Sequence, residues 1–183
     1  MRPVDTATLI AELDALPGTY VLLLHCARRV LIGVGRRIPA MFAPGWYLYV
    51  GSAQGPGGVR ARLGRHLRGD GRVRWHIDYL RRTMDPAGAW VAYGHACLEH
   101  TWARELAGQR GLDVIAGIGA SDCDCASHLF HARRRPCLAA FATALGDAGS
   151  RPPQLELGIR AAGSPYTDAR STPTGPDSDM SPT

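Results

Sequence analysis

The chain has 183 residues, of which 45% are hydrophobic and 20% are charged, and these values are typical of one soluble globular domain. No apolar run approaches the roughly 18 residues of a membrane-spanning helix, and the first residues, MRPVDTATLIAELDALPG, lack the apolar segment of a signal peptide. Composition therefore argues against a membrane or secreted protein, and we expect a cytoplasmic location.

The net charge of +5 is concentrated in one window. Residues 56–82 hold eight Arg and two Asp, a net charge of +6, so the rest of the chain is about neutral. Such a patch indicates a polyanionic partner whose binding weakens as salt rises, and a solvated basic helix face is the alternative. The chain has no Asn, and its five cysteines, an odd number, argue against a disulfide framework.

In chain order, the first expected element is a helix that Asp5 or Thr6 can cap and that runs to about Leu16. The apolar runs 19–25 and 30–35 then predict a β-hairpin. The other expected elements are a strand at 45–51, helices at about 57–68 and 74–83, a strand near 88–94, a helix at about 97–109, a strand-and-loop region at 111–131 and a helix from Pro136 to Leu145. We divide the chain into an N-terminal helix (1–16), a domain (17–146) and a disordered tail (147–183) that is rich in Pro, Ser, Thr and Gly.

Residues 45–80, GWYLYVGSAQGPGGVRARLGRHLRGDGRVRWHIDYL, are the most informative segment. A β-prone stretch leads into a glycine-rich loop and then into an arginine-lined helix, an arrangement that can present cations and backbone N–H groups to phosphate. We expect a nucleic-acid backbone to be contacted by Arg60, Arg65, Arg68, Arg72 and Arg74. Core packing is expected for Trp75, with base stacking as the alternative, and Asp78 is expected to pair with an arginine.

Two tyrosine-bearing strand segments, Gly18-Thr19-Tyr20 and Tyr49-Val50-Gly51, precede four polar residues in a fixed order: Arg62, His66, His76 and Glu99. This order resembles the GIY-YIG nuclease superfamily over about residues 15–145. The run YVGSAQGPGG…RL..H…WHIDYL…SDCDCASHLF resembles an uncharacterised branch of that superfamily, in which the domain is sometimes fused to a base-excision glycosylase. The resemblance implies an α/β (α+β) fold with a small, mainly antiparallel three-stranded sheet flanked by helices.

The resemblance also implies a metal-dependent endonuclease that hydrolyses phosphodiester bonds in DNA, in the context of repair, with Mg²⁺ or Mn²⁺ as cofactor. Glu99 is the implied metal ligand; Glu105 is its rival, but it lies about 240° farther round the same helix. Arg62 would clamp the scissile phosphate, and Tyr20 or Tyr49 would act on the attacking water. His66 and His76 are the candidates to orient the phosphate or relay a proton.

Two departures from the superfamily support an alternative function. Tyr20 and Tyr49 are 29 residues apart, farther than is usual, so Tyr47 competes with Tyr49 for the role. The Asn that many members carry late in the domain is absent, and its substitutes would be Asp122, Ser127 or His128. The alternative is a catalytically weak or inactive nucleic-acid-binding module that works with a DNA-repair enzyme; the oligomeric state is left open.

A second group of possible metal ligands lies late in the domain: Cys123, Cys125, His128 and His131. All four are zinc-binding types, but their spacing is not a common structural-zinc spacing. We therefore favour buried small residues with a capping His over a Zn²⁺ site, and keep a zinc protein as the third hypothesis. Cys26, Cys97 and Cys137 are expected in the core.

Overall fold

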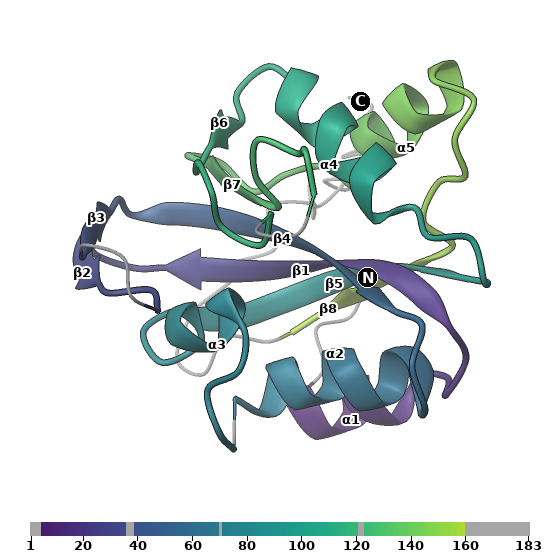
Figure 1. Cartoon of the computed structure of the whole chain (residues 1–183), viewed down its shortest axis with the longest axis horizontal. Coiled ribbons are helices and arrows are strands. Elements are labelled where there is room, and N and C mark those ends of the chain that lie inside the picture. Colours follow the sequence, from purple (N-terminus) through teal and green to yellow (C-terminus); the bar gives the residue numbers. More distant parts are fainter. Residues whose placement is uncertain (1–4, 36–38, 70, 121–122, 160–183) are drawn as a thin grey trace, which may run out of the picture.

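The computed structural model describes residues 5–35, 39–69, 71–120 and 123–159. A six-stranded sheet forms its centre, with the order β6-β7-β4-β1-β5-β8 and antiparallel pairing between neighbours (Figure 1). Its strands are β1 (Gly18–Cys26), β4 (Gly45–Ala53), β5 (Asp85–Tyr93), β6 (Asp113–Val114), β7 (Leu129–Ala132) and β8 (Leu155–Gly158). A mixed α/β fold with a mainly antiparallel sheet is thus confirmed. The expected number of three strands is wrong, because three strands of two to four residues extend the sheet on both sides of β4, β1 and β5.

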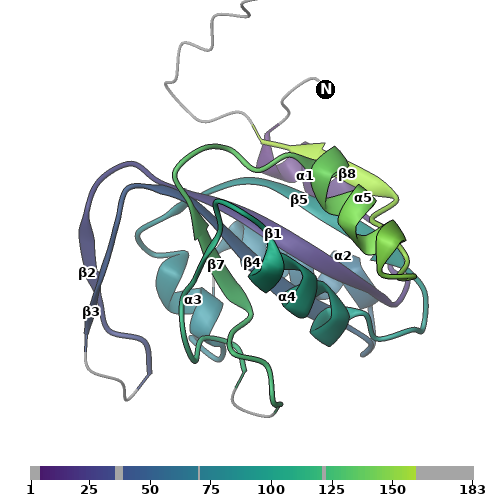
Figure 2. The same ribbon diagram turned by 90° about the horizontal axis from the view of Figure 1, so that it is seen from above.

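Helices cover both faces of this sheet. The helices α1 (Thr6–Ala11), α2 (Gly58–Arg68) and α3 (His76–Leu80) lie on one face, whereas α4 (Glu99–Gly108) and α5 (Leu138–Asp147) lie on the other (Figures 1 and 2). Successive residues of a strand point to opposite faces, so β1 contributes Tyr20 and Leu22 to the first core and Val21 and Leu23 to the second. Burial on both faces explains why β1 is almost continuously apolar.

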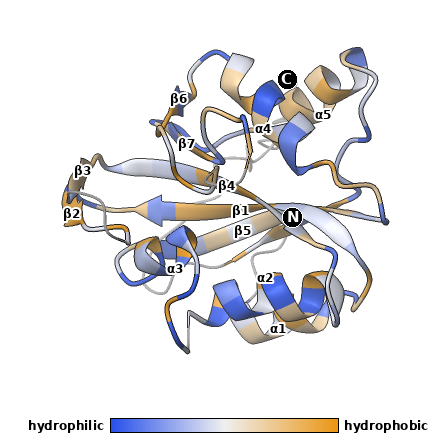
Figure 3. Cartoon of the chain, viewed as in Figure 1, coloured by the Kyte–Doolittle hydropathy of each residue, from blue (hydrophilic) through white to orange (hydrophobic). Residues whose placement is uncertain are grey.

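The α2 helix is amphipathic, and hydrophilic and hydrophobic positions alternate along it (Figure 3). Val59, Leu63 and Leu67 recur every four residues, so they share one face, and all three are buried against the sheet. The other side of the helix carries the arginines. The strongly basic segment is therefore a helix whose apolar stripe is fully used in packing.

The glycine-rich loop before α2 serves a close contact between two backbone segments. Asp5 caps α1 by accepting hydrogen bonds from the N–H groups of its first turn, and α1 ends at Ala11, earlier than expected. The following residues run beside the start of α2, where the Val59 N–H donates to Leu16 O at 2.9 Å. Gly58 has a φ of +53°, and a Cβ there would lie 2.1 Å from Leu16 O. The expectation that this loop presents its N–H groups to phosphate is thus wrong for Val59, whose N–H is already used.

Two further expectations about the strands are wrong. The predicted hairpin between residues 19–25 and 30–35 does not form: β2 (Val30–Ile32) pairs instead with β3 (Ala40–Phe42), and β1 pairs with β4 and β5. The predicted disordered tail begins too early, because β8 lies within it and pairs with β5. The remainder of that predicted tail, residues 160–183, lies outside the described residues. Within the described ranges, no helix combines the length and apolarity that crossing a bilayer requires.

Candidate active site

The candidate site lies beside the first residue of β7, beyond which the last residues of β4 are at the edge of the sheet. β7 pairs with β4 only over residues 46–49, followed by one bond from the Val50 N–H to His128 O. Beyond that point β4 continues with Gly51, which pairs with Tyr20 of β1. A Cβ at Gly51 would lie 2.6 Å from the Tyr20 hydroxyl oxygen, so the glycine gives that hydroxyl the space it occupies.

Tyr20 places a fully buried phenol at this edge. Its hydroxyl has no well-aligned hydrogen-bond partner within the described structure, although the Arg62 guanidinium lies close enough to interact with it. Burial raises the pKa of Tyr20 well above its ordinary value; neighbouring Tyr49 raises it further, Arg62 lowers it and Glu99 raises it. Tyr20 therefore keeps its proton at neutral pH and can act as a hydrogen-bond donor rather than as a base.

Tyr49 and His66 adjoin Tyr20. The ring centroid of His66 lies 6.2 Å from that of Tyr20 and 6.4 Å from that of Tyr49. His66 is buried, and its Nδ1 lies 3.2 Å from Asp78 Oδ1. Burial lowers the pKa of His66, although the hydrogen bond and charge of Asp78 act in the opposite direction. The imidazole is thus neutral at pH 7, and donation from Nδ1 to Asp78 makes Nε2 an acceptor.

Asp78 holds this part of the site together. Its carboxylate accepts hydrogen bonds from Arg65 Nη2 at 2.8 Å and from the N–H groups of Arg74 and Trp75 at 2.8 and 3.0 Å. Burial alone would raise the pKa of Asp78, but the hydrogen bonds from His66 and these donors outweigh it and hold that pKa well below the usual value. The expected pairing of Asp78 with an arginine is confirmed.

Arg62 projects from α2 into the same cluster. Its guanidinium carbon lies 4.4 Å from the ring centroid of Trp75, a cation–π contact, and its Nε is buried without a hydrogen-bond partner. Trp75 is 42% exposed, so its expected place in the core is wrong. The indole supports a cation at the surface because α3 begins at the next residue and turns Trp75 outward.

The five arginines expected to contact a nucleic-acid backbone fall into two groups. Two are used within the protein: Arg60 Nε donates to Leu13 O, and Arg65 binds Asp78. The other three are exposed: Arg68, Arg72 and Arg74. Their nucleic-acid contacts stay a prediction, and the exposed three are the better placed for it.

Glu99 reaches the site from the opposite face of the sheet, as the first residue of α4. The Leu98 N–H donates to Thr19 Oγ1 at 3.1 Å, and this bond fixes the start of α4 against β1. Glu99 Oε1 lies 3.0 Å from His128 Nδ1, the distance of a charge-assisted hydrogen bond although the direction is not aligned. Of the two acidic residues weighed as metal ligands, Glu99 is the one that contacts this histidine. Glu105 lies six residues farther along α4.

His76 and a turn in the chain close the site on the remaining side. The Gly119 N–H donates to His76 Nδ1 at 2.9 Å, which links α3 to the segment before β7. Gly119 has a φ of +76°, and a Cβ there would lie 2.9 Å from the Cβ of His128 and 3.1 Å from Tyr49 Cε2. This backbone link fixes the His76 ring beside the segment that carries His128.

The structure distinguishes among the sequence alternatives for Tyr49 and for the missing Asn. The Tyr47 hydroxyl donates to Ala43 O at 2.9 Å, so it points away from the cluster of Tyr20, Tyr49 and His66. Burial also raises the pKa of Tyr47 to about 12. Ser127 is likewise used internally, because its hydroxyl donates to two backbone carbonyls and accepts the Leu129 N–H. His128 lies in the site, and Asp122 is outside the described residues.

The expected group of soft metal ligands is rearranged. Cys123 and His128 lie together, with Sγ 3.4 Å from Nε2, and His100 of α4 joins them. His131 lies elsewhere, because its ring contacts Asp113 and Pro44 O. Cys125 is half-buried, packs against the apolar cluster under α4 and has its thiol within hydrogen-bonding reach of the Cys123 thiol. Nothing in the sequence pattern indicated His100, which is a single exposed histidine on an amphipathic helix.

The other cysteines correct a further expectation. Cys26 is buried as expected, but Cys97 and Cys137 are exposed, so their expected place in the core is wrong. Each of the two lies just before a helix, where the chain is at the surface. Five described cysteines are free thiols, which agrees with the absence of a disulfide framework.

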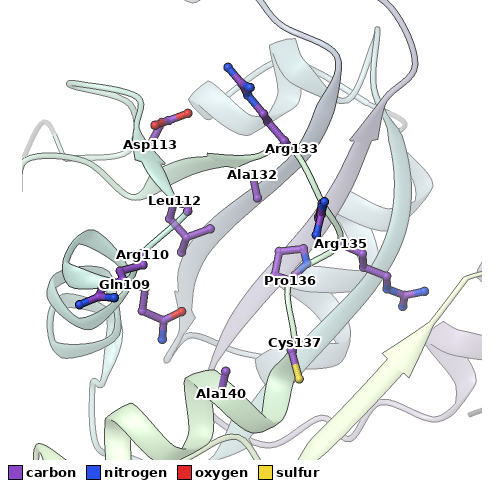
Figure 4. Close-up of a pocket in the computed structure, with 12 residues that line it drawn as sticks. Gln109, Arg110, Leu112, Asp113, Ala132, Arg133, Arg135, Pro136, Cys137 and Ala140 are labelled. Carbon is purple, nitrogen blue, oxygen red and sulfur yellow. The ribbon is translucent and has the colours of Figure 1, made fainter.

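A second basic feature lies at the far end of α4. A hollow of about 530 Å³ is lined by the end of that helix, by β6 and by the connection from β7 to α5 (Figure 4). Four exposed arginines and one aspartate contribute to it: Arg110, Arg133, Arg134, Arg135 and Asp113. The Arg135 guanidinium carbon also lies 5.4 Å from the ring centroid of Trp46. A helix of ten residues is about 15 Å long, so the hollow and Glu99 are separated by about that length.

The arrangement therefore combines a cation, a protonated phenol, a neutral histidine oriented by a carboxylate, and a carboxylate beside a histidine. This combination can bind a phosphoryl group, accept a proton and hold a divalent cation.

Comparison with known proteins places the chain in one family. No curated protein and no solved structure matches it. The model of the family described as Domain of unknown function DUF123 matches residues 19–149, a range that includes every described residue of the candidate site. The chain therefore belongs to the DUF123 family.

Proposed function

We propose that this chain is a metal-dependent endonuclease of the GIY-YIG type, which hydrolyses phosphodiester bonds in DNA and serves in DNA repair. The observation that carries the proposal is a pair of buried polar atoms, Tyr20 Oη and Arg62 Nε, that have no well-aligned hydrogen-bond partner although the Arg62 guanidinium lies near the phenol, in one basic cluster. Buried polar groups are nearly always paired, so two such groups together indicate a polar ligand. A phosphate suits them, because Arg62 supplies positive charge and Tyr20 supplies a donor.

Each binding residue has a distinct role in this proposal. Arg62 neutralises charge on the scissile phosphate, and its stacking on Trp75 limits the orientations of the guanidinium. Tyr20 keeps its proton and donates a hydrogen bond to a phosphoryl oxygen. This assignment leaves Tyr49 as the phenol that acts on the attacking water.

Proton removal is assigned to Tyr49 and His66. The attacking water transfers its proton through the Tyr49 hydroxyl to His66 Nε2, and the imidazolium that forms is stabilised by Asp78. His66 suits this task because burial lowers its pKa and keeps it neutral at pH 7. A free phenol has a pKa of about 10, so Tyr49 serves better as a relay than as the final acceptor.

Glu99 is the residue that would hold the metal ion. Mg²⁺ and Mn²⁺ are commonly held by one or two carboxylates, with waters and substrate phosphate completing the shell, and Glu99 is a carboxylate on the surface of this site. The bound ion would supply neutralisation of charge on the phosphoryl oxygens. The donor set therefore fits such an ion, with Glu99 as its protein ligand.

The DNA-binding surface in this proposal extends from the site in two directions. The exposed arginines Arg68, Arg72 and Arg74 lie on the α2–α3 side, and the arginine-lined hollow lies at the far end of α4. Duplex DNA carries about one charge per 1.7 Å of its axis, so a stretch of about 15 Å presents several phosphates. The spacing of about 15 Å between Glu99 and the hollow is therefore short enough for one bound duplex to contact both.

A second candidate function is a nucleic-acid-binding module without catalysis. It is favoured by the absence of the Asn of the resembling superfamily and by the internal use of Ser127, which cannot replace it. On this reading the arginine surfaces bind DNA and a partner repair enzyme performs the chemistry.

Plasmid nicking separates the two candidates. Wild type is compared with Glu99→Gln, Arg62→Ala and the control Arg82→Ala, an exposed arginine after α3, each with Mg²⁺, with Mn²⁺ and with EDTA. A nuclease should nick only with metal. Arg62→Ala should reduce the rate by about 10²–10³-fold, while Arg82→Ala should have little effect. DNA binding without metal-dependent nicking by the wild type would reject the nuclease and favour the binding module.

A further inference from the structure

We infer that His100, Cys123 and His128 form a zinc site next to Glu99. The inference does not rest on the proposed nuclease activity, because it follows from the ligand atoms alone. One ligand atom from each of the three residues lies within 4.8 Å of the other two. His128 is buried, Cys123 is half-buried and His100 is exposed, so the group lies at the surface and an ion can enter it.

The best-defined pair already has the geometry of two zinc ligands. Zinc–sulfur bonds are about 2.3 Å and zinc–nitrogen bonds about 2.0–2.1 Å, so tetrahedral ligands of these types lie about 3.6 Å apart. Cys123 Sγ and His128 Nε2 are 3.4 Å apart. Only small side-chain movements are needed to bring the third ligand, His100, to the same separation.

The other nitrogen of His128 also lies within reach of the partner expected in a zinc site, and a small rotation of the ring would align the two. A zinc-bound histidine nearly always directs its second ring nitrogen to a carboxylate or carbonyl, which fixes the tautomer and the ring orientation. His128 Nδ1 lies 3.0 Å from Glu99 Oε1. Glu99 would accept this N–H while His128 Nε2 binds the ion, so Glu99 is a positioning residue for zinc.

The donor types favour zinc over magnesium. One thiolate and two imidazoles are borderline-soft ligands that suit Zn²⁺, whereas Mg²⁺ takes oxygen ligands. Three protein ligands leave a fourth tetrahedral position, which water or the neighbouring thiol of Cys125 can fill. An ion here would also join α4 to the segment before β7 and thereby hold Glu99 at the edge of β4.

The same contacts could instead form a thiol activated by a histidine and a carboxylate, without metal. His100 argues for the zinc site, because an activated thiol needs no second histidine near its sulfur. Its ring centroid lies 5.7 Å from that of His128, on the α4 side of the pair.

The experiment measures metal in the full chain without nucleic acid. Protein purified without chelator is analysed for zinc by plasma mass spectrometry, and apoprotein is titrated with Co²⁺ while visible absorption is recorded. We expect about one zinc per chain and the d–d and thiolate-to-cobalt bands of a tetrahedral site. His100→Gln and Cys123→Ser should each lose these bands. Glu99→Gln should keep the bands but weaken zinc affinity by about 10–100-fold.

Matched controls come from exposed residues outside the group. His95→Gln and Cys97→Ser should keep both zinc and the cobalt spectrum. His100 is exposed, so its replacement tests the ligand without disturbing the core. Wild type that binds neither zinc nor Co²⁺ would overturn the inference, and so would a Cys123→Ser variant with an unchanged spectrum. Rapid alkylation of Cys123 by iodoacetamide in metal-free protein without Co²⁺ uptake would point instead to the activated thiol.

Discussion

Replacing Asp78 with alanine should lower the free energy of unfolding by about 3 kcal/mol at pH 7. The loss of the acceptor for the N–H groups of Arg74 and Trp75 removes a cap-type interaction of about 1 kcal/mol. Buried His66 loses its partner, which costs about 1–2 kcal/mol. The contact with Arg65 adds only about 0.5 kcal/mol, because that side chain is 25% exposed and the pair is screened by solvent. The melting temperature should fall by roughly 10 °C.

The contribution of Asp78 should also depend on pH. The hydrogen bonds hold its pKa in the folded protein below the value of about 3.9 in the unfolded chain, so its stabilisation is complete above that value. It is lost progressively as pH falls from about 4 towards the lowered pKa. His66 titrates in the same range and Asp78 raises its pKa, so the effect is measured in a His66→Gln background. There the difference between Asp78 and Asp78→Ala should shrink by about 1 kcal/mol between pH 7 and pH 3.

Urea unfolding followed by tryptophan fluorescence, at pH 7 and at about pH 3, measures both effects. Asp85→Ala is the matched control, because Asp85 is exposed at the start of β5 and its loss should change stability by less than about 0.5 kcal/mol. The reasoning is refuted if Asp78→Ala is no less stable than Asp85→Ala at pH 7, or if its deficit in the His66→Gln background is the same at both pH values.

Four other outcomes are expected. Tyr20→Phe should leave stability unchanged or raise it by up to about 1 kcal/mol in a thermal melt, because the buried hydroxyl has no well-aligned partner, while plasmid nicking should be lost. A stability loss above about 1 kcal/mol would show that the contact with Arg62 stabilises the fold. Gly51→Ala should destabilise by about 1–3 kcal/mol, since its Cβ would meet the Tyr20 hydroxyl, whereas Gly55→Ala has open space and should not. Arg133→Ala should reduce the salt slope of DNA binding by about 1 in gel-shift titrations, and an unchanged slope would remove the hollow from the DNA surface. The nicking rate should decline in acid only below pH 6.5, because burial lowers the pKa of His66. A rate that already declines above pH 6.5 would exclude His66 as the base.

The parts of the fold that could be predicted are those with local signals. The Asp5 cap and the two long strands β1 and β4 follow from side-chain hydrogen bonding and from apolar runs that need burial on both faces. The strand β8 could not be predicted, because its four residues lie in a Pro-rich region and become a strand only through pairing with β5. The hairpin was wrongly predicted for the same reason, because β1 pairs with β4 and β5 rather than with the next strand in the chain.

The candidate site was also predicted only in part. The order of Tyr20, Tyr49, Arg62, His66 and Glu99 predicted a cluster, and the structure brings these residues to one edge of the sheet. Their contacts with Asp78 and His128 come from other elements, so no spacing in the sequence encodes them. Trp75 was misplaced for a related reason. An indole is apolar enough to suggest the core, but Trp75 stands just before α3 at the surface and stacks there on the Arg62 guanidinium.

Glu99 joins the two proposals, because its carboxylate lies beside His128 and at the edge that holds the phenols. The variant Cys123→Ser can separate the two proposals, since it removes a zinc ligand but does not replace Glu99 itself. If zinc only positions Glu99, zinc-free wild type and Cys123→Ser, both assayed with Mg²⁺, should nick more slowly than zinc-loaded wild type, and excess Mg²⁺ should restore part of the rate. If Cys123→Ser loses zinc and nicks at the wild-type rate, the zinc site and the nuclease site are independent. The position of Glu99 would then depend on contacts within the protein, namely the bond from Leu98 to Thr19 and the contact with His128.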